Sequence, residues 1–202
     1  MGKGILVVLS GPSGTGKGTI CKALLKRNPE VRLSISCTTR VPRHGEVDGV
    51  NYFFTNKEKF QEMISEENFL EYANVYGNYY GTPKSYVEQT LEMGIDVLLE
   101  IDTQGALAVK ESFDDGVFIF LMPPSLDELK NRIIGRGSET EETLNKRFGA
   151  AAAEIKLAEK YHYAVINENI NDAVELIESI IKAEKCKIQR IKDNILVLQE
   201  VK

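Results

Sequence analysis

The sequence has few cysteines and histidines, and those that it has form no chemical cluster. Its three cysteines, Cys21, Cys37 and Cys186, are odd in number and widely spaced. They therefore predict neither a disulfide framework nor a C-x-x-C metal site. Free thiols in a reducing cytoplasm are the expected state. The only two histidines, His44 and His162, can build no Ser-His or metal constellation, and we expect both to be ordinary surface residues.

Long hydrophobic runs and an excess of positive charge are also missing. The apolar run at residues 5–9 is too short for a signal sequence or a membrane span. A net charge of -5 argues against a general nucleic-acid or membrane-surface binder. We therefore expect a cytoplasmic protein with no nucleic-acid partner and no membrane partner. Any attraction for phosphate must come from local clusters of Arg and Lys.

The hydrophobic pattern predicts an α/β fold. The 202 residues suit one compact domain with one or two small insertions. The apolar, β-branched run at 4–9 is typical of a strand buried on both faces of a parallel sheet. Further buried strands are expected at 96–101, 117–122 and 163–166, followed by helices at 104–111, 125–134 and 171–185. Strands that alternate with helices indicate a parallel sheet with right-handed crossovers.

Two segments depart from this alternation. The first is rich in Thr, Arg, Tyr, Asn and Gly, and has the pattern of a small α+β insertion. The second holds a Gly-Arg-Gly turn and an Ala-rich helix, which favours a mobile, charged lid. The predicted organisation is a core at 1–35, an insertion at 36–90, core again at 91–130, a lid at 131–158, and core with a C-terminal tail at 159–202. The tail after Cys186 is expected to be an extra edge strand or a loosely packed end.

A glycine-rich loop follows the first predicted strand and opens a helix. Its pattern Gly11-x-x-x-x-Gly16-Lys17 in this context is typical of a phosphate-binding loop. Glycines allow backbone N–H groups to form an anion nest, and the helix N-terminus adds its positive end. A tight turn without a ligand is the alternative, which the lysine and the strand context disfavour. The residues expected to bind ATP here are Gly11, Pro12, Ser13, Gly14, Thr15, Gly16, Lys17, Gly18 and Thr19.

One position departs from the usual loop. The Ser or Thr that normally follows the lysine and binds Mg²⁺ is replaced by Gly18, with Thr19 next. Nucleoside monophosphate kinases such as adenylate kinase resemble this Gly-Lys-Gly-Thr form. Because Mg²⁺ readily keeps several waters, we expect the ion to be held mainly by ATP phosphates and water.

Beyond the loop, several segments carry a family resemblance. They are Ser36-Cys-Thr-Thr-Arg-Val-Pro-Arg, Phe69-Leu-Glu-Tyr-Ala, Gly77-Asn-Tyr-Tyr-Gly-Thr, Glu100-Ile-Asp-Thr-Gln-Gly and Ile134-Gly-Arg-Gly. In order and spacing the chain resembles the guanylate kinase family over about residues 4–185. The resemblance implies a three-layer P-loop kinase with a nucleoside-monophosphate-binding insertion and a helical lid. It also implies direct in-line transfer of the ATP γ-phosphoryl group to GMP and dGMP, by a monomer or a homodimer.

The resemblance implies that Arg40, Arg43, Tyr52 and Tyr80 hold the GMP phosphate. Two guanidinium groups can neutralise a dianion bidentately, and two phenol hydroxyls can complete the shell. A solvated basic loop is the alternative for this Thr-Arg-x-Pro-Arg stretch, and the accompanying tyrosines disfavour it.

The guanine base is assigned by the same resemblance to Ser36, Glu71, Thr82 and Asp102. Guanine presents N1–H and N2–H₂ side by side, so one carboxylate can accept both donors, and Glu71 is the expected acceptor. Adenine would leave that carboxylate unpaired, which hydrogen-bonding sites reject by about 10⁴ to 10⁵. An exposed strand residue is the alternative for Glu71.

Two acidic residues end one predicted strand. Glu100 and Asp102 lie two positions apart, so both face the edge where α/β proteins bind ligands. They can orient GMP and the waters of Mg²⁺. Relatives often carry Asp at the first position, so Glu100 is a longer-armed departure.

The lid and the last strand carry the remaining candidates. Arg132, Arg136 and Arg147 resemble arginines that reach across the ATP phosphates, with a solvated helix face as the alternative. Asn167 resembles a residue near the adenine base. Together the expected catalytic residues are Lys17, Arg40, Arg132, Arg136 and Arg147.

Three rival functions follow from the same features. Another nucleoside monophosphate kinase would share the loop and lid but accept AMP or a pyrimidine nucleotide. A guanylate-kinase-like interaction module would bind peptides without catalysis, and such modules typically lack an intact phosphate loop. A regulatory GTPase is disfavoured because the chain has no Asn-Lys-x-Asp guanine loop.

Overall fold

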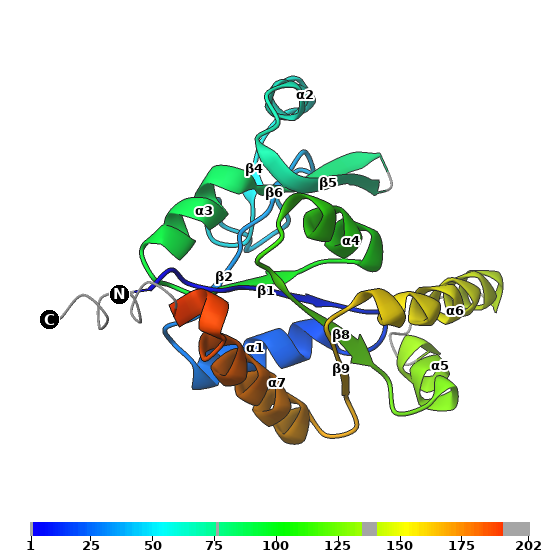
Figure 1. The fold of residues 1–202 in the computed structure, drawn as a ribbon. Helices are drawn as coiled ribbons and strands as arrows, with labels where there is room; N and C mark the ends of the chain where they lie inside the picture. The colour runs from blue at the N-terminus through cyan, green and yellow to red at the C-terminus, as the bar shows by residue number, and fades with distance from the viewer. Residues whose placement is uncertain (1, 76, 135–140, 192–202) are drawn as a thin grey trace, which may run out of the picture.

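The computed structural model describes residues 2–75, 77–134 and 141–191, and it is built around a five-stranded parallel sheet (Figure 1). The sheet has the order β2-β7-β1-β8-β9, and every neighbouring pair is parallel. Its strands are β1 Leu6–Ser10, β2 Arg32–Leu33, β7 Val97–Glu100, β8 Val117–Met122 and β9 Tyr163–Ile166. The central strand β1 is buried along its whole length, as its continuous apolar run predicts.

Helices cover both faces of the sheet, which gives three layers (Figure 1). On one face, Val7 of β1 packs with Leu24 of α1 (Lys17–Arg27) and Ile177 of α7 (Ile170–Lys185). On the other face, Val8 packs with residues of α3 (Lys84–Glu92) and α4 (Thr103–Ser112), including Val109. Successive β1 side chains thus enter opposite cores, because side chains alternate along a strand. The α/β fold with a parallel core is confirmed.

A second sheet, of four strands, lies within the segment 36–90 that the sequence predicts to be an insertion. Its order is β4-β3-β6-β5, with β3 Cys37–Thr38, β4 Phe53–Phe54, β5 Phe69–Val75, β6 Asn78–Pro83 and the helix α2 Lys57–Ser65. Phe60 of α2 is fully buried and stacks on Phe69 with ring centroids 4.4 Å apart. A Cβ on Gly81 would lie 2.8 Å from the ring of Phe69, so this close approach needs glycine. The aromatic cluster therefore holds α2 on the hairpin β5-β6.

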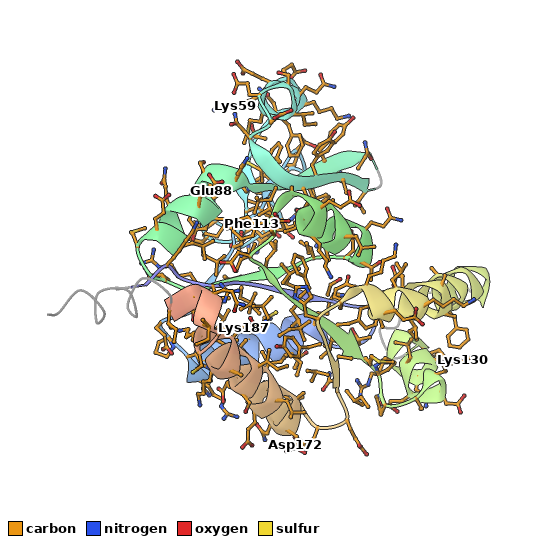
Figure 2. The ribbon with its side chains drawn as sticks, viewed as in Figure 1. Lys59, Glu88, Phe113, Lys130, Asp172 and Lys187 are labelled. Atoms are coloured by element: carbon orange, nitrogen blue, oxygen red, sulfur yellow. The ribbon has the colours of Figure 1, made fainter. Side chains whose placement is uncertain are left out.

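Two helices and a short 3₁₀ segment lie beyond the carboxyl end of β8. They are α5 Leu126–Ile134, α6 Glu141–Ile155 and η1 Lys156–Lys160. Leu129 of α5 and Ala151 of α6 are fully buried together, which joins the two helices. In the side-chain view, the labelled Lys130 of α5 points outward, as do Lys59 of α2 and Asp172 of α7 (Figure 2). Arg136 of the predicted lid lies outside the described residues.

The first part of the tail after Cys186 does not form the edge strand that was one of its two expected structures. Residues 188–191 are helical, so that expectation is wrong for this segment. The Arg190 side chain ties this segment to the loop before β8. It donates to Oδ2 of Asp115 at 2.8 Å and to the backbone carbonyl oxygen of Asp115 at 2.9 Å. Among the described residues, no helix is long and apolar enough to cross a membrane.

Candidate active site

The phosphate-binding loop joins β1 to α1. Gly11, Gly14 and Gly16 all have positive φ, which L side chains rarely adopt. A Cβ on Gly11 would lie 2.3 Å from the carbonyl oxygen of Leu121, so only glycine fits beside β8. The N-cap of α1, Gly16, offers no side-chain cap, so the first N–H groups of the helix stay available for an anion.

Lys17 is folded into this loop. Its Nζ donates to the carbonyl oxygens of Gly11 at 2.5 Å and Pro12 at 3.2 Å. Burial lowers the pKa of Lys17, and the nearby carboxylates of Glu100, Glu154 and Asp102 oppose that shift. The Lys17 ammonium group thus lies at a loop whose backbone amides can bind an anion, where it can contact phosphate oxygens. The neighbouring acids favour its charged form.

A cavity of about 370 Å³ opens next to the loop and joins several predicted ATP residues. Asn167 is buried there, and its side-chain Nδ2 donates to the carbonyl oxygen of Thr15 at 2.7 Å. Arg132 donates to the carbonyl oxygen of Asn167 at 3.3 Å and to Glu128 at 2.9 Å. The cavity is lined by Gly14, Gly16, Thr19, Arg132, Asn167, Glu168 and Ile170. Of the other lid arginines, Arg147 lies on α6, where the structure does not describe its side chain.

A second cavity, of about 320 Å³, lies between the insertion and the end of β7. It is lined by Ser36, Tyr52, Glu71, Ala73, Val75, Tyr80, Glu100, Ile101 and Asp102. Six of the nine residues predicted for GMP therefore meet in one place. The pairing of β5 with β6 explains part of this, because Glu71 is opposite Thr82 and Ala73 is opposite Tyr80.

Glu71 is an acid of this cavity whose pKa is raised. The hydroxyl of Thr82 donates to its Oε1 at 2.6 Å, and its Oε2 faces Gly105 near the start of α4. Burial raises the pKa of Glu71 to about 6, and the hydrogen bond from Thr82 partly opposes that shift. Asp102 caps α4 by accepting from the amide of Gly105 at 2.8 Å, and its charge raises the pKa of Glu71 further.

The two predicted phosphate arginines are placed differently. The guanidinium of Arg40 lies 5.4 Å from the ring centroid of Tyr52, and the rings of Tyr52 and Tyr80 are 5.9 Å apart. Arg40 also pairs with both oxygens of Glu46, at 2.8 and 2.9 Å. Arg43 is exposed on the same loop and is not among the residues that line the cavity. Its backbone amide donates to the Glu46 carboxylate at 2.7 Å, and its carbonyl oxygen accepts from the Glu46 amide at 3.1 Å.

Sequence reasoning missed Glu46. Its carboxylate binds the Arg40 side chain and the Arg43 amide, and these hydrogen bonds lower its pKa. The signal in the sequence was the position of Glu46, three residues after Arg43. An acid at this spacing can stabilise a turn by accepting a hydrogen bond from the backbone amide of the earlier residue.

Comparison with known proteins now decides the family. The sequence model described as guanylate kinase matches residues 3–184. The chain belongs to the guanylate kinase family. Among curated guanylate kinases, that of Clostridium perfringens is 61% identical over 98% of this chain and 92% of its own length. That of Caldanaerobacter subterraneus is 58% identical over 98% of this chain and 96% of its own length.

A solved structure supports the same assignment. The crystal structure of guanylate kinase from Anaplasma phagocytophilum matches with a TM-score of 0.74 and 36% identity, covering 94% of this chain and 90% of that one. The three-layer core of this guanylate kinase family member is thus shared by a solved relative.

A further acid of this guanylate kinase family member also escaped sequence reasoning. Glu154 on α6 is partly buried and faces Lys17, Asp102 and the phosphate loop. Burial raises its pKa, while Lys17 and hydrogen bonds from the Ser13 amide and the Thr103 hydroxyl oppose that shift. Its signal in the sequence was weak, a single carboxylate closing an Ala-rich helix. Through it, α6 contacts both the loop and the start of α4.

Proposed function

We propose that this guanylate kinase family member transfers the γ-phosphoryl group of ATP to GMP, giving ADP and GDP. The observation that carries the proposal is a pair of cavities near Lys17: the first includes its neighbour Gly16, and the second includes Glu100 and Asp102, whose charges act on Lys17. One is lined by the phosphate loop, and the other by the end of β7 and the hairpin β5-β6. Donor and acceptor phosphates bound in these cavities would meet at the carboxyl edge of the sheet, where α/β proteins bind ligands.

The second cavity suits guanine better than other bases. Glu71 offers an acidic acceptor whose Oε1 is already oriented by the Thr82 hydroxyl. N1–H and N2–H₂ of guanine would satisfy this carboxylate, whereas adenine would leave it without donors. Ser36 and Asp102 line the same cavity and complete the base site. Because the proposed contacts involve the base and the phosphate, dGMP should be accepted as well.

The proposed transfer is direct and in line, without a phosphoenzyme. The acceptor is already an anionic phosphate oxygen, so positioning and charge neutralisation are the main tasks. Lys17 and the lid arginines Arg132, Arg136 and Arg147 would neutralise the transferring group. Arg40 and Arg43 would hold the acceptor phosphate, which requires Arg40 to exchange Glu46 for the phosphate.

The carboxylate oxygens near Lys17 are ligands of the kind that fits Mg²⁺ carried by the nucleotide. Among the described residues, no group of three or more His, Cys, Asp or Glu could hold a metal alone. Glu100 and Asp102 nevertheless place carboxylate oxygens beside Lys17, and oxygen is the ligand that Mg²⁺ prefers. When bound, Mg²⁺ supplies positive charge to the β- and γ-phosphates. Closure of the insertion 36–90 and the lid 131–158 over the core would exclude water.

Partners and location follow from this chemistry. The proposed partners are ATP and GMP or dGMP, in a cytoplasm where these nucleotides and reduced thiols are found. Cys21 and Cys37 are buried free thiols and Cys186 is an exposed one, as a reducing compartment allows. The assembly as monomer or homodimer stays a prediction.

The test is a substrate panel. Purified protein is mixed with ATP, Mg²⁺ and each nucleoside monophosphate in turn, and ADP release is followed. We expect turnover with GMP and dGMP alone, and a large loss of turnover in the Lys17→Met variant. Turnover with AMP or CMP would overturn the base assignment. A folded protein that binds ATP but turns over no acceptor would instead favour an interaction module.

A further inference from the structure

Gly105, in the first turn of α4, is in contact with two acids that line the cavity proposed for GMP. Its backbone amide donates to Asp102, the N-cap of α4, at 2.8 Å. A Cβ built on Gly105 would lie 3.1 Å from Oε2 and 3.5 Å from the carboxyl carbon of Glu71, which belongs to β5. One buried residue thus lies between the start of α4 and the carboxylate expected to bind the base.

The backbone of Gly105 does not require glycine. Gly105 is not among the glycines with positive φ, and alanine is more favourable than glycine within a helix. The contact with Glu71 gives a reason for glycine at this position. A Cβ contact of 3.1 Å is closer than nine in ten of those found in proteins, so an alanine here would force its neighbour to shift.

The Glu71 carboxylate is the group that would shift. Helix α4 lies next to β5 (Figure 1), and Leu70 of β5 and Ala106 of α4 are buried in one hydrophobic core. Close packing of this core resists movement of the helix away from the strand. The end of a glutamate side chain moves more easily. A methyl group at position 105 would therefore displace the carboxylate from the position in which Thr82 donates to its Oε1 at 2.6 Å.

We propose that Gly105 is a positioning residue for guanine recognition. Because it has no side chain, the Glu71 carboxylate can lie against the first turn of α4, oriented to accept both N1–H and N2–H₂ of the base. This inference rests on the proposed GMP site. Gly105 acts through Glu71 and contacts no reacting atom. The alternative is a structural role, in which glycine serves only the packing of α4 on β5.

The test measures nucleotide binding without ATP and without turnover. Calorimetry gives the dissociation constants of GMP and of inosine monophosphate for the wild type, Gly105→Ala, Glu71→Ala and the double variant. Inosine monophosphate has the same phosphate and the N1–H donor but lacks the N2 amine, so the ratio of the two affinities reports on the base contact. Urea unfolding of each protein reports on stability. Gly149→Ala, an exposed glycine of α6 whose Cβ would have nothing within 4 Å, is the matched control.

Gly105→Ala should weaken GMP binding by about 10-fold, the loss expected when a hydrogen bond to a charged group is misaligned. Inosine monophosphate should lose less affinity, so the preference for GMP should fall. Adding Gly105→Ala to Glu71→Ala should change neither affinity, because no carboxylate remains to be displaced. The urea midpoint of Gly105→Ala should stay at or above that of the wild type. Gly149→Ala should bind both nucleotides as the wild type does.

Three results would overturn the inference. An unchanged GMP affinity in Gly105→Ala would show that the missing side chain does not position the carboxylate. Equal losses for the two nucleotides with a lower urea midpoint, or a failure to fold, would establish the structural role instead. The same loss in the Glu71→Ala background would show that Gly105 does not act through Glu71.

The wild type separates this inference from the proposed function. A wild type that binds no GMP would overturn the proposed function, and the inference with it. A wild type that binds GMP beside a Gly105→Ala variant that binds it equally well would overturn the inference alone.

Discussion

The protonation of Glu71 should control GMP affinity across the mildly acidic range. Burial raises its pKa to about 6, because a buried site favours the neutral acid. Guanine offers two hydrogen-bond donors, so it binds the ionised carboxylate and lowers the pKa again. GMP binding should therefore release a proton near pH 6, and the affinity for GMP should fall as the pH falls.

The magnitude follows from the ionised fraction. With a pKa of about 6, Glu71 is about 97% ionised at pH 7.5 and about 9% ionised at pH 5.0. The dissociation constant for GMP should therefore rise about tenfold between these pH values through Glu71 alone. The GMP phosphate also titrates, with a second pKa near 6, and adds its own slope.

Glu71→Gln separates the two titrations. At pH 7.5 this variant should bind GMP about 10- to 100-fold more weakly, because a hydrogen bond to a charged group is worth about 1.5 to 3 kcal/mol. Its remaining pH dependence should be that of the phosphate. Calorimetry in buffers of different ionisation enthalpy should show proton release at pH 6 that is larger for the wild type. Identical pH profiles in the two proteins would refute the reasoning.

The raised pKa of Glu71 also affects the free energy of unfolding. The pKa of Glu71 is raised from 4.5 to about 6, so its ionised form destabilises the fold by about 2 kcal/mol above pH 6. That penalty is absent below the unfolded pKa and grows as the pH rises through the two values. Glu71→Gln should therefore unfold at pH 7.5 with a free energy at least equal to that of the wild type. A large loss of stability would show that the ionised carboxylate has a structural role.

Three further predictions address the loop, the insertion and closure. Lys17→Met should lower turnover by at least about 100-fold, as loss of a preorganised charge contact does. His162→Ala is the control and should leave turnover almost unchanged. Comparable rates of the two variants in a coupled ADP assay would contradict this prediction. Gly81→Ala should destabilise the fold by about 1 to 3 kcal/mol in urea unfolding, because its Cβ would meet the Phe69 ring at 2.8 Å. Gly149→Ala is the matched control, since it lies in α6 with nothing within 4 Å, and should stabilise by about 0.5 to 1 kcal/mol. A bisubstrate analogue should reduce the radius of gyration in solution scattering, and an unchanged value would argue against closure of the insertion and lid.

The sequence by itself determined the local elements. The apolar run before Gly11 predicted β1, because a strand buried on both faces needs apolar side chains at every position. Alternating strand and helix patterns predicted the parallel core, and β7, β8 and β9 lie within a residue of their expected positions. The phosphate loop was equally local, since Gly11, Gly16 and Lys17 act within one turn. The family followed from motifs in fixed order and is confirmed by the comparisons.

Only the tertiary structure decided how charged groups meet. The raised pKa of Glu71 depends on burial between the insertion and α4, which no local pattern encodes. Glu154 of α6 lies close to Lys17 and Ser13 of the phosphate loop, although more than 130 residues separate them in the chain. The proximity of Gly105 to Glu71 joins residues far apart in the chain. Local propensity acts over a few residues, whereas burial and electrostatics depend on every group that folding brings near.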